Sequence, residues 1–79
     1  LFDLFPSPTK DFTTIYLKEI IKDKIVIEII DVNGIKILSK YYDQTDQHIV
    51  IDIITYPAGI YFIKVKTKDK VEVKKVIIQ

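Results

Sequence analysis

Few residues in this chain are of types that do chemistry, and the single histidine is the first to consider. His48 is the only histidine, and the chain contains no cysteine. A catalytic histidine needs a positioned nucleophile or carboxylate, and a histidine that binds zinc needs companion ligands. Neither pattern surrounds His48 in the sequence. We therefore interpret it as a structural residue and predict no catalytic residue and no enzyme activity.

Two acidic segments could hold a cation. The first is Asp31-Val32-Asn33-Gly34, which resembles the opening of a calcium loop but lacks the later acidic ligands and the bidentate glutamate. A reverse turn, in which Asp and Gly are favoured, explains these residue types better than calcium binding does. The second is the polar loop 43–47, where a cation between Asp43 and Asp46 stays an open alternative to a solvated loop. We predict no metal site and no cofactor.

Five tyrosines offer the remaining chemistry, which is stacking on sugar rings. Tyr41 and Tyr61 are predicted to lie in the core. Packing at sheet edges is the more plausible role of the three others, Tyr16, Tyr42 and Tyr56.

Composition narrows the function classes further. The chain has 79 residues, of which 48% are hydrophobic and 11% aromatic, so one small domain must be stabilised by burial alone. Its twelve basic residues are all lysines, and its net charge is +1, which argues against a nucleic-acid partner. Two glycines cannot build a glycine-rich phosphate loop. We expect no membrane span and no signal peptide, and interpret the chain as a piece of a longer protein.

The elements that must position these residues are predicted to be β-strands. Pro57 and Gly59 mark a turn, after which Tyr61, Ile63 and Val65 alternate with lysines as in a half-buried strand. Tyr61 resembles the corner tyrosine of immunoglobulin-like sandwiches, whose hydroxyl bonds to upstream backbone. A tyrosine that packs with its hydroxyl in water is equally compatible with the pattern.

Residues 24–31 and 35–42 are predicted to form a hairpin around Asn33-Gly34. A two-residue turn would pair Ile29 with Leu38 and mix polar and apolar residues on both faces. A three-residue loop with Gly34 in the left-handed region instead pairs Asp31 with Ile35 and Ile29 with Ile37. We favour this second register because it separates the faces cleanly. It places one set in the core, namely Ile25, Ile27, Ile29, Ile35, Ile37 and Tyr41, and the polar set Glu28, Lys36 and Lys40 on the opposite face.

The other predicted strands complete an all-β fold. Residues 11–17 form a strand rather than a helix, Phe2 and Leu4 contribute a short edge strand, and 48–54 bury Ile49, Ile51 and Ile53. In residues 71–78 the apolar positions change face at Lys74-Lys75, which suggests a bulge there or a strand buried on both sides near its end. We predict a small immunoglobulin-like antiparallel β-sandwich of six to seven strands.

Several apolar residues are predicted to face outward. If contiguous, they would mark a partner-docking surface or the interface with an upstream domain. They are Val26, Ile30, Leu38, Val50, Ile54 and Phe62.

Four motifs, in order along nearly the whole chain, resemble those of the type A C-terminal sorting domain of the Gram-negative type IX secretion system. Phe5-Pro6-Ser7-Pro8 is similar to its aromatic-Pro-Asn-Pro opening, and an aliphatic strand ends in Asp31-Val32-Asn33-Gly34. The third motif is Pro57-Ala58-Gly59-Ile60-Tyr61, and the last is Lys74-Lys75-Val76-Ile77-Ile78. The sequence departs from the family pattern at Ser7, Ile35 and Gln79.

The resemblance implies that residues 1–79 are a single C-terminal sorting domain, in which residues 1–8 are an extended proline-containing segment or the end of a linker. Such a domain directs an upstream cargo protein across the outer membrane, to the cell surface or the medium. The implied partners are the outer-membrane translocation machinery and a surface sortase-like peptidase that removes the domain. The alternative is an adhesive or carbohydrate-binding sandwich module of a multidomain surface protein.

Overall fold

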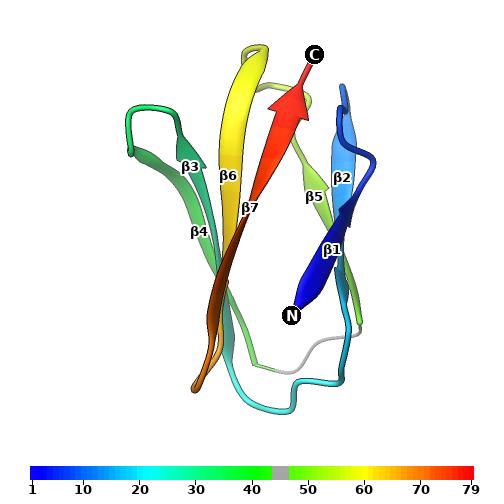
Figure 1. Ribbon diagram of the computed structural model, residues 1–79, viewed down its shortest axis with the longest axis vertical. Coiled ribbons are helices and arrows are strands. Elements are labelled where there is room, and N and C mark those ends of the chain that lie inside the picture. The colour runs from blue at the N-terminus through cyan, green and yellow to red at the C-terminus, as the bar shows by residue number, and fades with distance from the viewer. Residues whose placement is uncertain (44–46) are drawn as a thin grey trace.

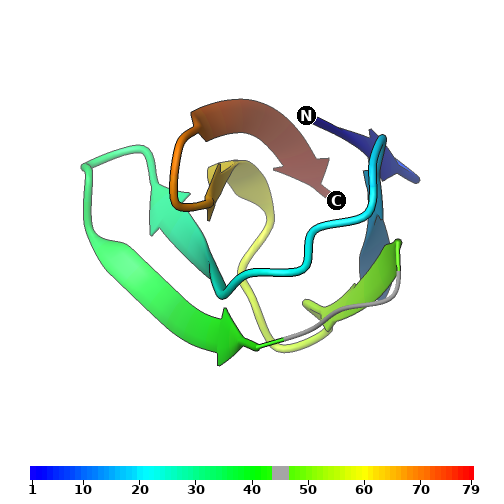
Figure 2. The ribbon, with the colours of Figure 1, turned by 90° about the horizontal axis from the view of Figure 1, so that it is seen from below.

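Seven β-strands make up the part of the chain that the computed structural model describes, residues 1–43 and 47–79, where no helix is present. They form an antiparallel three-stranded sheet of order β1-β2-β5 and an antiparallel four-stranded sheet of order β4-β3-β6-β7. The strands are β1 (Phe2–Phe5), β2 (Phe12–Leu17), β3 (Ile25–Asp31), β4 (Lys36–Tyr42), β5 (His48–Asp52), β6 (Gly59–Lys66) and β7 (Val71–Ile78). The two sheets face each other as the layers of a small sandwich (Figures 1 and 2). The predicted all-β antiparallel sandwich is confirmed.

The core lies between the sheets and takes alternate side chains from each strand, because successive residues of a strand point to opposite faces. In β6, Tyr61, Ile63 and Val65 are buried as predicted, and Ile49, Ile51 and Ile53 are buried in and after β5. The other buried hydrophobic residues are Phe2, Ile15, Leu17, Ile25, Ile27, Ile29, Val76 and Ile78.

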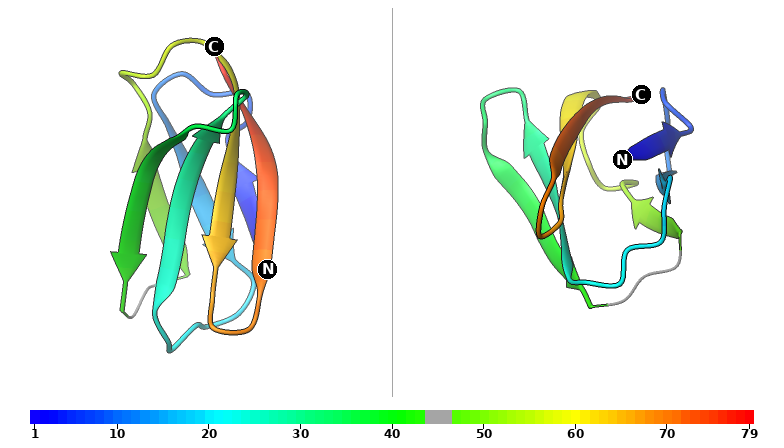
Figure 3. Two further views of the ribbon diagram at one scale, coloured as in Figure 1. Left: turned by 90° about the vertical axis from the view of Figure 1, so that its left-hand side faces the viewer. Right: turned by 60° about the horizontal axis from the view of Figure 1, so that its bottom comes forward.

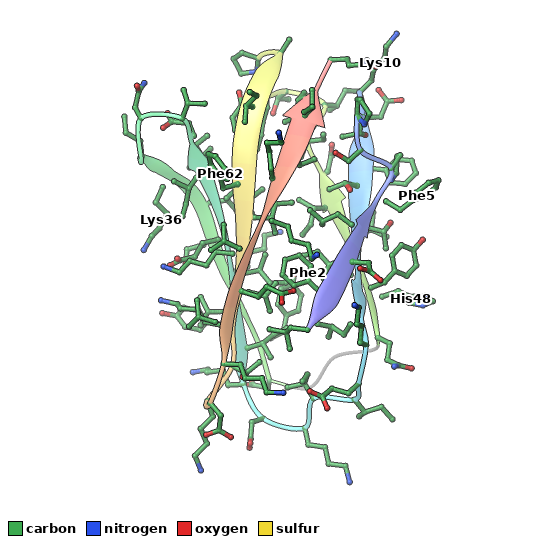
Figure 4. All side chains as sticks on the ribbon, in the orientation of Figure 1. Phe2, Phe5, Lys10, Lys36, His48 and Phe62 are labelled. Atoms are coloured by element: carbon green, nitrogen blue, oxygen red, sulfur yellow. The ribbon has the colours of Figure 1, made fainter. Side chains whose placement is uncertain are left out.

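The first two strands follow the sequence pattern. Residues 12–17 form a strand, as predicted, and the β-branched Thr13, Thr14 and Ile15 favour this extended geometry over a helix. β1 pairs with β2 at the edge of its sheet, and Phe2 points between the sheets and is fully buried (Figure 4). The extended segment at the start of the chain is therefore an integral part of the sandwich.

The β3–β4 hairpin combines both registers that the sequence allows. Near the turn the predicted register holds, since the Asp31 amide donates to the Ile35 carbonyl at 2.9 Å and Gly34 has a φ of +83°. The register then shifts, so that Ile30 pairs with Lys36 but Ile29 pairs with Leu38, and Ile37 has no partner. This extra residue moves every later side chain of β4 to the other face.

The bulge makes part of the predicted core wrong. Ile37 and Tyr41 are 42% and 67% exposed. Leu38 and Tyr42 pack against the core in their place, so the outward orientation predicted for Leu38 is also wrong. Ile35 lies before the bulge, where the predicted register holds, but it is also 59% exposed, so its predicted burial is wrong as well. Lys40 pairs with the core-facing Ile27 and does not share the face of Glu28.

β7 contains no bulge. Its pairing with β6 is continuous from Gly59↔Ile78 to Lys66↔Val71, so the bulge suggested at Lys74-Lys75 is wrong, although the apolar positions do change face there. Val71 and Val73 are exposed on the outer face, and Ile77 is exposed as well, so the strand is not buried on both sides near its end. The apolar residues change face for a simpler reason. In the first half of the strand, two polar residues, Glu72 and Lys74, occupy the inward positions.

Candidate functional site

Part of each of the four sequence motifs lies at one end of the sandwich, which we call the motif end, whereas Lys74 and Lys75 lie in the middle of β7. The motif end consists of the segments 5–12, 31–36, 53–59 and 77–79. Figures 1 and 3 show the β1–β2 connection, the β3–β4 turn, the β5–β6 connection and the C-terminal end of β7 gathered there. The strands that run toward this end, β1, β3, β5 and β7, each lead into or out of a motif. The opposite end carries the segments 18–24, 43–47 and 67–70.

The first and last motifs are in direct contact. The Thr9 amide donates to the Ile77 carbonyl at 2.9 Å, and the Gln79 amide donates to the Thr9 carbonyl at 2.8 Å. Thr9 and Ile78 thus form a parallel bridge, and the Ile77 amide donates to Ser7 Oγ at 3.4 Å. The segment between β1 and β2 therefore covers the end of β7, whose backbone would otherwise be an open sheet edge. Sequence reasoning missed Thr9, and nothing in the linear pattern identifies its pairing.

The third motif builds a tyrosine corner. The Tyr61 hydroxyl donates to the Pro57 carbonyl at 2.7 Å, which decides between the two predicted roles in favour of the corner. Gly59, at a φ of +155°, allows the chain to turn directly into β6. Tyr56 packs 5.8 Å from the Tyr61 ring, and burial raises the pKa of its hydroxyl. This corner fixes the β5–β6 connection to the core.

The second motif is a turn held by one carboxylate. Asp31 Oδ1 accepts hydrogen bonds from the amides of Asn33 and Ile35, both at 2.9 Å, and the Asp31 carbonyl accepts from the Gly34 amide at 3.0 Å. These contacts are those of an Asx turn combined with a β-turn. The interpretation of this segment as turn chemistry is confirmed by these hydrogen bonds.

The motif residues divide into buried and exposed groups. Tyr61, Val76 and Ile78 are buried, so their side chains hold the motif end together and are not available to a partner. Phe5 points away from the β1-β2-β5 sheet and is 67% exposed (Figure 4). Lys75 and Ile77 are also exposed, on the outer face of β7. The exposed group can provide contacts to another molecule, whereas the buried group can only shape the surface.

A charged cluster lies on the outer face of the four-stranded sheet, where the sequence predicted Glu28 and Lys36 but not their ion pair. The side chain of Glu28 is only 5% exposed, and its Oε2 lies 2.8 Å from Lys36 Nζ and 3.8 Å from Lys66 Nζ, with Lys64 Nζ 4.0 Å from Oε1. The hydrogen bond from Lys36 is the main reason why the pKa of Glu28 is lowered. The sequence does contain a sign of this cluster. Glu28 stands in an otherwise aliphatic strand, and the neighbouring strands contain lysines.

The residues considered for chemistry are dispersed. His48 is exposed, and its ring contacts Tyr16 edge-on with centroids 4.7 Å apart (Figure 4). Within residues 1–43 and 47–79, no three histidine, aspartate or glutamate side chains come together in a way that could hold a metal ion. Asp43 is exposed, and Asp46 lies outside the described residues. Tyr42 and Tyr56 pack against the core.

One further finding concerns membranes. The part of the chain described by the structure contains no helix that is long and apolar enough to cross a bilayer.

Comparison with known proteins adds one match. A family model described as "Secretion system C-terminal sorting domain" matches residues 3–79, and therefore all four motifs. Among curated proteins, none matches the sequence.

Proposed function

This chain belongs to the family of secretion-system C-terminal sorting domains, and from that premise we propose that it directs an upstream cargo protein through the outer-membrane translocation machinery. Membership of this family makes it a type IX sorting signal, exported across the outer membrane to the cell surface or the medium. We further propose that residues 1–79 act as one domain and that a surface sortase-like peptidase removes it after export.

The observation that carries the proposal is the assembly of part of each of the four motifs at the motif end. Residues 5–8 and 74–78 are separated by most of the chain, yet the segments that contain them are joined by backbone hydrogen bonds through Thr9. A receptor that binds this end can therefore contact the first and the last motif together. It can do so only if the sandwich is folded.

We assign two roles to the motif residues. A shaping group makes the turns and fills the core beneath them. Its members are Asp31, Gly34, Pro57, Gly59, Tyr61, Val76 and Ile78. A contact group presents side chains to the machinery. Its members are Phe5, Pro6, Pro8, Lys75 and Ile77, of which Pro6 is half-buried. Lys74 belongs to neither group, because it points inward from β7 and its Nζ lies 5.9 Å from the centroid of the Phe2 ring.

Removal by a peptidase requires an accessible bond upstream of β1. The Phe2 amide donates to Glu72 Oε1 at 3.2 Å, which ties the start of β1 to β7. The Leu1 carbonyl accepts a hydrogen bond from the Lys18 amide at 3.0 Å, so the backbone is already paired at Leu1. Because proteolysis concentrates at unpaired backbone, we expect the cut upstream of this paired region and not within the strands.

The first test is export of a reporter. Residues 1–79 are fused behind a folded reporter that carries a signal peptide, in a cell with a working type IX system. We expect the reporter at the surface or in the medium. Retention in the periplasm, with the fusion intact and folded, contradicts the proposal.

A second test examines the terminal motif. Deleting residues 74–79 should abolish export, but this also removes buried Val76 and Ile78. The double substitution Lys75→Ala/Ile77→Ala leaves those core residues in place and should also reduce export. A matched control is Ile20→Ala/Lys22→Ala, which changes the same residue types at the opposite end, where both are exposed. Equal export of the two variants would refute the assigned role of Lys75 and Ile77.

A further inference from the structure

The outer face of the four-stranded sheet, which points away from β1, β2 and β5, is unusually apolar for a surface. Pairing in register places Val26 beside Lys66, and Ile30 beside Phe62. On β7 the outward positions include Val71 and Val73, which are 60% and 48% exposed. Of the outward apolar residues that the sequence raised as a possibility, Ile30 and Phe62 are neighbours on this face, whereas Val26 lies beside Lys66.

The charged residues on this outer face are mostly lysines. Four lysines point outward from its strands, namely Lys36, Lys64, Lys66 and Lys75, and Glu28 is the one outward carboxylate on these described strands. Four lysines against one glutamate give +3, whereas the whole chain carries +1. Because Glu28 is buried beneath three of these lysines, an approaching partner meets the ammonium groups and not the carboxylate.

A shallow depression lies at the end of this outer face that is remote from the motif end. It has a volume of about 460 Å³. Three lysines, Lys24, Lys66 and Lys68, line it together with Asp23, Val26 and Thr67. Lys24 Nζ also lies 4.8 Å from the centroid of the Tyr41 ring. Such a depression suits a carboxylate on a partner, since ammonium groups attract a charge without requiring a bidentate geometry.

We propose that this outer face docks onto a protein of the secretion machinery whose surface presents carboxylates around an apolar centre. The inference rests on the proposed function and specifies the chemistry of its partner. Lys75 and Ile77, the outward half of the terminal motif, lie on this same face, so the motif end and the outer face form one continuous surface. In Figure 4, Lys36 and Phe62 lie on the side of the sandwich opposite to Phe5 and His48.

A protein fits this outer face better than an anionic membrane does. Val26, Ile30 and Phe62 are half-buried within the sheet, so they can pack against a complementary flat surface. Binding at a bilayer interface instead relies on an apolar face that enters the acyl boundary, which side chains held between lysine stems do not provide. The sheet geometry and the charge together favour a protein partner.

The test reverses charge on this outer face while leaving the Glu28 cluster intact. Lys24→Glu/Lys75→Glu is compared with Lys18→Glu/Lys22→Glu, in which two exposed lysines lie off the face and away from the motif end. Each variant is placed in the reporter fusion, and its thermal unfolding is measured as the isolated chain to verify that it is folded. We expect export by the first pair to fall about ten-fold and export by the second to change less than about two-fold.

A second pair of variants tests the apolar part. Val71→Ser/Val73→Ser should reduce export several-fold, whereas Val50→Ser, on the outer face of the other sheet, should not. If both face variants fold and are exported as well as wild type, the inference is overturned. If the wild-type fusion itself stays in the periplasm, the proposed function fails first, and the two failures are thereby distinguished.

A third measurement separates a protein from a lipid partner. The purified 79-residue chain is sedimented with vesicles of phosphatidylglycerol and phosphatidylcholine at physiological salt. We expect no co-sedimentation above that of the Lys24→Glu/Lys75→Glu variant. Wild-type binding that this variant loses would overturn the choice of a protein partner and assign the face to an anionic lipid surface.

Discussion

The buried polar side chains of this small domain have hydrogen-bond or ion-pair partners within the fold. The Tyr61 hydroxyl reaches the Pro57 carbonyl, and the Glu28 carboxylate lies among three lysines. Within the described residues, no buried side-chain nitrogen or oxygen lacks a hydrogen-bond partner. A buried polar group that loses its partner destabilises the folded state by more than the intact pair stabilises it. Single substitutions at these two residues should therefore change the free energy of unfolding measurably.

Tyr61→Phe removes a hydroxyl without removing the ring. We expect the free energy of unfolding to fall by about 1–2 kcal/mol, because the Pro57 carbonyl loses its donor in a part-buried corner. Urea denaturation measures this value. Tyr41→Phe is the matched control, since that ring is exposed, and it should change stability by less than about 0.5 kcal/mol. Equal effects of the two substitutions would show that the corner bond contributes nothing.

Glu28 should make stability depend on pH. Its pKa lies below the ordinary value of 4.5, chiefly because Lys36 donates a hydrogen bond to it. A carboxyl group with a lowered pKa in the folded state contributes stability that is fully present above its unfolded-state pKa. That contribution is lost as the pH falls through the folded-state pKa. We therefore expect Glu28→Gln to be less stable than wild type at pH 7, with the difference shrinking below pH 4.5.

Urea denaturation of both proteins at pH 7 and at about pH 3 measures this difference. Glu72 also has a lowered pKa, because the Phe2 amide donates to it, so both proteins retain some dependence on acid. Glu19→Gln, in an exposed ion pair with Lys70, is the control and should change little at either pH. A difference between wild type and Glu28→Gln that is the same at both pH values argues against the lysine cluster as its source.

At the scale of the element, β7 connects the interior with the proposed docking face. Its inward positions from Val76 onward fill the core, and its outward positions from Val71 to Ile77 lie on the outer face. The strand is an edge of its sheet, and Thr9 covers only its last residues. One strand can therefore serve both stability and recognition, because alternate residues belong to opposite faces.

Substitutions at two valines of β7 test its inward and its outward face separately. Val76→Ala should lower the free energy of unfolding by about 2 kcal/mol, because it removes buried methyl groups and leaves a cavity. Val73→Ala makes the same chemical change on the outward face and should cost less than about 0.5 kcal/mol. Thermal or urea unfolding compares them. If Val73→Ala were the more damaging substitution, the observed alternation of β7 would be wrong.

At the scale of the whole molecule, stability should be lowest at the edges of the sheets. β3 and β6 are the central strands of the larger sheet, paired on both sides, whereas β1 and β4 are edge strands. A domain of this size buries only about 60% of the surface of its unfolded chain, so local opening should be frequent where pairing is one-sided.

Hydrogen exchange followed by NMR tests this expectation. The amides of β3 and β6 that bond to each other should exchange only through global unfolding, and those of β1 and β4 should exchange faster. The Thr9 and Gln79 amides, which join the first and last motifs, should be protected more strongly than other amides outside the strands. Unprotected amides at these two positions would mean that the motif end is open in solution.

The sequence by itself determined the fold class, most of the core and the family. Alternation of apolar and polar residues has a period of two in each strand, and this local property predicted the inward faces of β5 and β6 correctly. Turn chemistry was equally local, because Asp31 and Gly34 act on their immediate neighbours. The family was identified from four motifs and from their order along the sequence, and the family model matches the same residues.

Only the tertiary structure decided the features that depend on residues far apart in the chain. The bulge at Ile37 placed Leu38 and Tyr42 against the core instead of Ile37 and Tyr41, because packing against the opposite sheet outweighed the cleaner local pattern. The pairing of Thr9 with β7 and the burial of Glu28 beneath three lysines likewise arise from strands that meet only after folding. A linear pattern records which face a residue prefers, but not which residue lies opposite it.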